Sequence, residues 1–169
     1  MFVYYCKQLA IVSITIKDFS CYMLEKIAEL ECKANIILPL YAKILISETG
    51  TIEQILSILT NSKTQVKILK QKESPELIKR QIFIINKKTG ERLAYARSNI
   101  FPTCLPQKII KKIKERKEGI GKIIVNSKLE TFRYILKIGY DSKTKSAFRI
   151  YQIIHKGRVA FEIKENFTI

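Results

Sequence analysis

The end of the chain, from Phe148 to Ile169, most constrains what this sequence can fold into, because it is typical of a β-hairpin. Two runs rich in β-branched and aromatic residues flank the turn-like segment 155–158. Alternate residues of the second run share one face of a strand. They are Val159, Phe161, Ile163, Glu165 and Phe167.

Glu165 therefore lies on an apolar face in this reading. A buried carboxylate must find a cationic or hydrogen-bonding partner or keep its proton, because unpaired burial costs several kcal/mol or more. Glu165 is thus a candidate acid. A slip of one residue in strand register would instead place it in water.

Four further strands are expected upstream, and the segment Lys87–Gly90 is a clear hairpin turn between two of them. Hairpin connections make neighbouring strands antiparallel, so the sequence predicts an α+β domain with about six antiparallel strands. A polar loop is expected over 139–146. The upstream strands are expected at 64–71, 77–86, 91–101 and 129–138, and helices at 18–33, 36–46, 51–59 and 106–118.

The two short helices of 36–46 and 51–59 surround a turn, Ser47–Gly50. This spacing superficially suggests a DNA-binding helix-turn-helix, but neither helix has the pattern of a recognition helix. A flap or a packing element is the favoured interpretation.

Two other features have both a functional and a structural interpretation. Arg80 shares an apolar strand face with Ile82 and Ile84. It is either a buried binding residue or a side chain at the start of a strand that reaches solvent. The segment Gly119–Lys122 holds two glycines around one residue, so it forms either a tight turn or a close approach to a ligand, where free amides bind a carboxylate.

The charge of the chain limits the kinds of partner it can bind. With 31 basic and 15 acidic residues among 169, the net charge is +16, which favours anionic partners such as nucleic acid, acidic lipids or a small polyanionic metabolite.

The length of the chain suits a single domain over 1–169. The cysteines of the chain, Cys6, Cys21, Cys32 and Cys104, have no disulfide or zinc spacing, so a reduced cytoplasmic protein is expected. The apolar start, 1–16, is interrupted by Lys7, and no run is long enough to span a bilayer.

The sequence lacks the residues that several kinds of catalytic and binding site require. The one histidine, His155, falls at the expected hairpin turn and is interpreted as an exposed turn residue. No nucleotide-binding fingerprint and no cluster of metal ligands occurs. An enzyme of this sequence would therefore need no metal or cofactor and would use carboxylates, arginines and backbone amides for proton chemistry on an anion.

Short segments in order from about Ile44 to Phe167 resemble the chorismate lyase-like family, in particular its archaeal chorismate–pyruvate lyase branch. An N-terminal helical segment, 18–35, precedes the match. The matching segments are 48–52, 80–84, 95–98, 105–106, 120–124, 129–133, 149–151 and 163–167.

The resemblance implies a six-stranded antiparallel sheet with helical flaps over a buried site, and cleavage of chorismate to 4-hydroxybenzoate and pyruvate. It also implies roles for single residues. Arg80 would bind the ring carboxylate, helped by the backbone amide of Ile120 beside the small Gly121. Glu165 would stand as the acid near the ring oxygen and the enolpyruvyl ether. Arg97 would line the neighbouring part of the cavity, and Gly50 would close the flap.

A desolvated Glu165 would have a raised pKa, whereas a nearby arginine would lower it, so Arg80 is expected to hold the substrate and not Glu165. The chain departs from the family pattern in two places: Thr168 replaces the usual proline, and the flap sequence Glu48-Thr49-Gly50 is one residue longer.

Two alternatives stay open. The first is a small-molecule sensor of the same fold, which would need a partner protein because only about 35 residues precede the match. The second is charge-driven nucleic-acid binding, which is less favoured because few aromatic residues lie near the basic helix. Chorismate is thus the expected partner, no membrane association is expected, and the sequence does not decide the oligomeric state.

Overall fold

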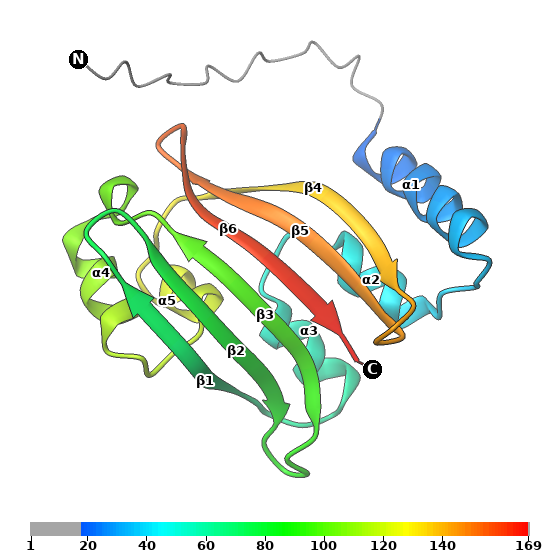
Figure 1. Cartoon of the computed structure of the whole chain (residues 1–169), viewed down its shortest axis with the longest axis horizontal. Helices are drawn as coiled ribbons and strands as arrows, with labels where there is room; N and C mark the ends of the chain where they lie inside the picture. The colour runs from blue at the N-terminus through cyan, green and yellow to red at the C-terminus, as the bar shows by residue number, and fades with distance from the viewer. Residues whose placement is uncertain (1–17, 169) are drawn as a thin grey trace.

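The computed structural model describes residues 18–168, and these form one six-stranded sheet with helices packed against it (Figure 1). The helices are α1 (Phe19–Ala34), α2 (Leu40–Ser47), α3 (Ile52–Leu59), α4 (Gln107–Lys114) and α5 (Ile120–Asn126), with a short 3₁₀ helix at Pro102–Cys104. The strands are β1 (Thr64–Glu73), β2 (Ile78–Asn86), β3 (Arg92–Ile100), β4 (Phe132–Asp141), β5 (Ser146–His155) and β6 (Arg158–Phe167).

The sheet has the order β1-β2-β3-β6-β5-β4, and every neighbouring pair is antiparallel. Two hairpin-connected groups of three strands therefore meet where β3 pairs with β6. This confirms the predicted α+β class with a six-stranded antiparallel sheet. The terminal hairpin β5–β6 lies inside the sheet, with β6 near its middle (Figure 1).

Strand register decides which side chains face the helices. Ala96 of β3 is paired with Glu165 of β6, and Glu165 is paired with Arg149 of β5. Because paired residues project to the same face of a sheet, these three residues share the inner face. The alternation expected for the last strand is therefore confirmed from Phe161 to Phe167, with Phe161, Ile163, Glu165 and Phe167 all buried. Val159 is only half-buried, because the pairing of β5 with β6 shifts by one residue before it.

The helices begin where the sequence allows them to. Asp18 caps α1, and its side chain accepts a hydrogen bond from the Ser20 amide at 3.2 Å. Pro39 precedes α2 and Thr51 precedes α3. Helix α2 contacts β5 and α3 contacts β1, burying Leu45 and Leu56 completely. The helix pair thus packs on the sheet, as the favoured interpretation of these two helices expects.

Two apolar clusters divide the space between sheet and helices. One joins α4 and α5 to the sheet through residues such as Ile113, Ile123 and Phe161. The other joins α1, α2 and α3 to the sheet through residues such as Leu45, Leu56 and Phe167. The candidate site lies at the boundary between the two clusters.

The structure differs from the sequence-based expectations in two places. No helix was expected after Gly119, yet this residue is the N-cap of helix α5. Strand β4 also continues through Gly139 to Asp141, where a loop was expected. Gly139 fits a strand here because the ring of its cross-strand neighbour Phe148 covers it and would collide with any added Cβ.

His155 also differs from its expected exposed position. It is the last residue of β5, it is 8% exposed, and its Nδ1 lies 2.9 Å from the carbonyl oxygen of Glu130. The imidazole therefore joins the end of the strand to the loop before β4.

The apolar N-terminal segment, 1–16, and Cys6 lie outside the described residues. Within the described residues, Cys21, Cys32 and Cys104 are free thiols. No helix in the described part of the chain is long and apolar enough to cross a membrane.

Candidate functional site

A small cavity of about 40 Å³ lies between the inner face of the sheet, the segment before α3 and the start of α5. Strand β3 makes room for it, because the β3 residues that face it, Ala96 and Ser98, are small. The cavity is lined by residues from every strand except β1. They are Gly50, Thr51, Ile52, Glu53, Arg80, Ile82, Ile84, Ala96, Ser98, Gly119, Ile120, Gly121, Arg133, Tyr151, Ile153, Ile163 and Glu165.

Glu165 is buried in this cavity, with 4% of its surface exposed, and it has two hydrogen-bond donors. Arg149 Nε donates to its Oε2 at 2.8 Å, and the Tyr151 hydroxyl donates to its Oε1 at 3.0 Å. Of the two alternatives for a buried carboxylate, Glu165 therefore takes the first: it has a cationic partner. Sequence reasoning missed Arg149 and Tyr151, although both lie on the same alternating face of β5.

The surroundings of Tyr151 favour the protonated hydroxyl. Burial is the main cause that raises the pKa of this hydroxyl above its usual value, and the neighbouring Glu165 carboxylate raises it further. Both effects support the hydroxyl as a donor to Glu165.

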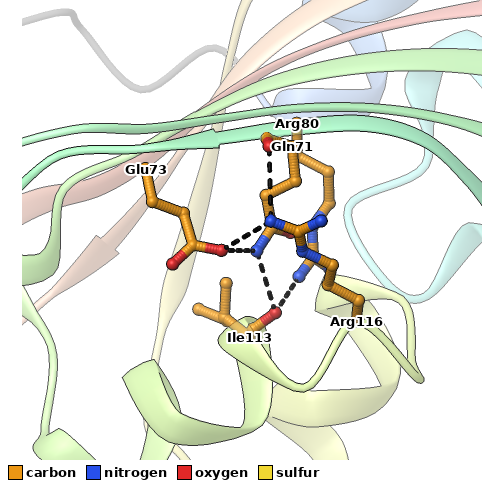
Figure 2. A network of polar contacts seen from close by, with 5 residues as sticks. All are labelled: Gln71, Glu73, Arg80, Ile113 and Arg116. Carbon is orange, nitrogen blue, oxygen red and sulfur yellow. Dashed lines mark hydrogen bonds and ion pairs between the residues drawn. The ribbon is translucent and has the colours of Figure 1, made fainter.

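Arg80 is buried, with 2% exposed, so the interpretation that it reaches solvent is wrong. Figure 2 shows its guanidinium between β1 and the turn that follows α4. Its Nε donates to Gln71 Oε1 at 2.6 Å, Nη1 to the Glu118 carbonyl at 3.1 Å, and Nη2 to the Ile113 carbonyl. All three acceptors are neutral, and Arg80 has no ion pair among the described residues.

Hydrogen bonds therefore fix the orientation of the Arg80 guanidinium, but no carboxylate among the described residues pairs with its positive charge. Burial, followed by the nearby charge of Arg116, lowers the pKa of Arg80 to about 10, so the guanidinium is still protonated at neutral pH. Arg116 is itself held by Glu73, whose Oε1 lies 3.1 Å from its Nη2 (Figure 2). Arg80 does not contact Glu165, as expected from the sequence.

Gly50, Ile120 and Gly121 line the same cavity as Arg80 and Glu165. Ile120 and Gly121 are the first two residues of α5, where backbone amides have no partner within the helix. Thr51 packs against Gly121, and a Cβ there would meet its Cγ2 at 3.2 Å. The small size of Gly121 thus brings the segment before α3 close to α5.

The flap, defined here as residues 48–51 between α2 and α3, covers the cavity and is tied to the sheet by two arginines. Arg149 Nη1 donates to the Glu48 carbonyl, and Arg133 Nη1 donates to the Thr49 carbonyl at 2.9 Å. Within the flap, the Gly50 amide donates to the carboxylate of Glu48. Sequence reasoning did not single out Arg133.

Arg97 does not line the cavity, which corrects the expectation for this residue. It is exposed, and it faces away from the helices because its neighbours in β3, Ala96 and Ser98, face the cavity. Its guanidinium lies 5.9 Å from the centre of the Tyr95 ring on the outer face. Arg133 of β4 lines the cavity together with Arg80 instead.

Glu53 is a second carboxylate at the cavity, which the sequence pattern did not indicate. It lies in the first turn of α3 with its Oε1 against Gly119. Burial is the main cause that raises the pKa of Glu53; the charges of Glu118 and Glu165 raise it further, and Lys122 opposes them. Among the described residues no group of three or more His, Cys, Asp or Glu side chains is placed to hold a metal ion.

The chain is similar in sequence to a known protein family. The model of the family described as "Chorismate pyruvate-lyase Rv2949c-like" matches residues 41–169. The chain belongs to this family. The matched region agrees with the resemblance seen from about Ile44 to Phe167.

Three curated relatives are named chorismate pyruvate-lyase, two from strains of Mycobacterium tuberculosis and one from Mycobacterium bovis. Each is 25% identical over 155 residues, covering 74% of this chain and 78% of the relative. A solved structure of a possible transcriptional regulator, YydK from Bacillus subtilis, overlaps 88% of this chain and 94% of its own, with a TM-score of 0.45 and 11% identity.

Proposed function

We propose that this protein is a chorismate–pyruvate lyase that converts chorismate to 4-hydroxybenzoate and pyruvate. The observation that carries the proposal is the single cavity that Arg80, Glu165, Ile120, Gly121 and Gly50 line together. These residues come from four separate parts of the chain. The family assignment supports the same general chemistry.

Arg80 is the proposed site for the ring carboxylate. Three neutral acceptors fix its guanidinium, and each of its Nη atoms has a second hydrogen that these bonds do not use. A carboxylate suits the planar fork of an arginine better than a point charge. The first amides of α5, at Ile120 and Gly121, are the proposed additional donors.

Glu165 is the proposed proton-transfer residue. In the reaction the ether bond between the ring and the enolpyruvyl oxygen breaks, and the ring carbon that bears the hydroxyl loses its hydrogen. The ring becomes aromatic, and enolpyruvate gains a proton on its methylene carbon to become pyruvate. Glu165 moves that proton, while Arg149 and Tyr151 hold its carboxylate in place.

The cavity of about 40 Å³ admits only a few water molecules. Chorismate therefore enters only when the flap moves away from the sheet. The bound substrate displaces water from the cavity, which strengthens the interactions of Arg80 and Glu165 with the anion.

The test is incubation of the purified full chain with chorismate without added metal, with 4-hydroxybenzoate measured by absorbance and pyruvate by mass. We expect turnover by the wild type and a loss of at least about 100-fold in kcat for Glu165→Gln. Full activity of Glu165→Gln would contradict the role of this residue. No product from a folded wild type would contradict the proposed function.

A further inference from the structure

We propose that Arg133 and Arg149 form a second anion subsite, which binds the second carboxylate of a dicarboxylate substrate when the flap opens. The inference rests on the proposed function for its choice of substrate class. In the sheet order, Arg80 lies on β2, on one side of the Glu165 strand, and Arg149 and Arg133 lie on β5 and β4, on the other side. The subsite and Arg80 thus bracket Glu165.

Unused donors are the first observation behind the subsite. Arg149 Nη2 and Arg133 Nε are both buried and have no hydrogen-bond partner. Buried polar groups almost always have a hydrogen-bond partner, so two guanidinium nitrogens without one are unusual. The side chain of Arg149 is 1% exposed, so bulk water does not solvate it.

The partners that these arginines do have are the second observation. Their Nη1 atoms donate to the consecutive flap carbonyls of Glu48 and Thr49. Two arginines thus hold two consecutive carbonyl groups of the flap, and guanidinium groups form stronger, charge-assisted hydrogen bonds with carboxylate oxygens. With the flap in this position, its carbonyls therefore occupy the donors that would bind the ligand's oxygens.

Charge is the third observation. Arg149 is paired with Glu165, but Arg133 has no ion pair among the described residues. The carboxylate of Glu48 also acts on Arg149, yet it belongs to the flap and is bonded to the Gly50 amide. When the flap moves away, two arginines face one carboxylate, which leaves a positive charge for an anion.

A consequence is discrimination between substrate and product. Chorismate has two carboxylates, whereas 4-hydroxybenzoate has one, and the second leaves with pyruvate. The subsite therefore strengthens binding of the substrate only. After cleavage the flap carbonyls return to the arginines, and the aromatic product is held at the Arg80 end alone.

The test uses two unreactive probes that differ in one carboxylate. The first is 3-(carboxymethoxy)benzoate, a dicarboxylate with an ether oxygen, and the second is 3-methoxybenzoate. Calorimetry on the wild type at fixed ionic strength is expected to give at least tenfold tighter binding of the dicarboxylate. Arg133→Met is expected to remove this preference and to change the affinity for 3-methoxybenzoate less than twofold.

Arg97→Met is the matched control, because it removes the same charge from the outer face of the sheet and is expected to keep the full preference. Arg133→Lys keeps the positive charge but loses the planar guanidinium, so it is expected to keep only part of the preference for the dicarboxylate. An equal loss for both probes in Arg133→Met, or no loss for either, would overturn the subsite. So would a wild type that does not prefer the dicarboxylate.

These binding measurements need no turnover, so their outcome is separate from that of the chorismate assay. A wild type that prefers the dicarboxylate through Arg133 but forms no product keeps the subsite and loses the proposed function. Turnover without any effect of Arg133→Met on the preference keeps the function and loses the subsite.

Discussion

Glu53 gives the clearest pH-dependent prediction at the scale of single residues. Its pKa is raised mainly by burial, so the folded state holds this proton more tightly than the unfolded state does. The stabilisation from Glu53 is therefore present below the unfolded pKa and is lost as pH rises through the folded pKa. We expect Glu53→Gln to melt at a higher temperature than the wild type at pH 7.5, by about 2–4 °C for each kcal/mol gained.

Thermal unfolding at pH 7.5 and pH 4 checks this expectation, since the difference must shrink at the lower pH, where Glu53 is protonated in both states. Glu115→Gln is a suitable control, because Glu115 is exposed at the end of α4. An equal shift at both pH values would show that the gain does not come from ionisation of Glu53.

Arg80 carries a second prediction at this scale, because two of its three acceptors have no other donor. Arg80→Met leaves Gln71 Oε1 and the Glu118 carbonyl without their donor, whereas the Ile113 carbonyl keeps the Arg116 amide and Gln71 Nε2. Each orphaned buried group costs about 1–3 kcal/mol, so we expect a loss of about 2–4 kcal/mol after partial rearrangement. Urea unfolding measures it, with the exposed Arg97→Met expected within about 0.5 kcal/mol of the wild type.

The site residues divide according to what strand alternation can reveal. Alternation placed Glu165 and Arg80 on apolar strand faces, and both are buried, but for Arg80 the pattern left open whether the side chain reaches solvent. Alternation along β3 also places Arg97 outside, since Ala96 and Ser98 line the cavity, but the family resemblance took precedence for this residue. The ion pair of Arg149 with Glu165 depends on the register of β5 against β6, which no local pattern determines.

At the scale of elements, the contact of α3 with the start of α5 depends on Gly119. A Cβ at this position would collide with Glu53 Oε1 and meet Val66 Cγ2 at 2.9 Å. The φ angle of Gly119 is −70°, so alanine meets only a steric obstacle and no backbone strain. We expect Gly119→Ala to lower the free energy of unfolding by about 1–3 kcal/mol.

Chemical denaturation of Gly119→Ala and of Gly119→Ala/Glu53→Ala tests the cause. Removing the Glu53 side chain must recover part of the loss, whereas the contact with Val66 remains. Gly121→Ala in the same helix is the control, because its nearest neighbour, Thr51 Cγ2, lies at 3.2 Å. If Gly121→Ala costs as much as Gly119→Ala, the contact with Glu53 is not the cause.

The elements that the sequence missed are those whose local signals are overridden by packing. Helix α5 has seven residues and starts within Gly119-Ile120-Gly121, a pattern typical of a turn, yet it buries Ile120, Ile123 and Ile124. Burial of three large side chains outweighs the weak propensity of the segment. Strand β4 continues past Gly139 for a similar reason, because Phe148 covers the glycine from β5.

At the scale of the whole molecule, the fold class could be predicted from the sequence because hairpin turns and strand periodicity are local signals. The geometry of the cavity could not be predicted from local patterns, because the cavity lies at the boundary of two apolar clusters, each assembled from residues far apart in the sequence. Its closure depends on contacts such as Arg133 with the Thr49 carbonyl, which are separated by 84 residues. No periodicity encodes contacts of this kind.

The net charge of +16 leads to the last prediction. Most of the lysines and arginines in the described residues form no ion pair, and four of the five pairs that do form lie at least partly exposed, where their contribution is small. Repulsion between these cations therefore opposes the compact state at low ionic strength, and salt screens it. We expect the melting temperature to rise by several degrees between about 10 mM and about 100 mM NaCl, as the Debye length falls from about 30 Å to about 10 Å.

Differential scanning calorimetry at pH 7.5 measures this rise, and sodium chloride and sodium sulfate at equal ionic strength separate screening from anion binding. Equal rises in the two salts indicate screening of the whole charge, whereas a larger rise in sulfate indicates an occupied anion site. Arg133→Met then locates that site, because the excess in sulfate disappears only if the anion binds between the two flap arginines. A melting temperature that falls with salt would mean that attractive ion pairs outweigh the repulsion of the excess lysines.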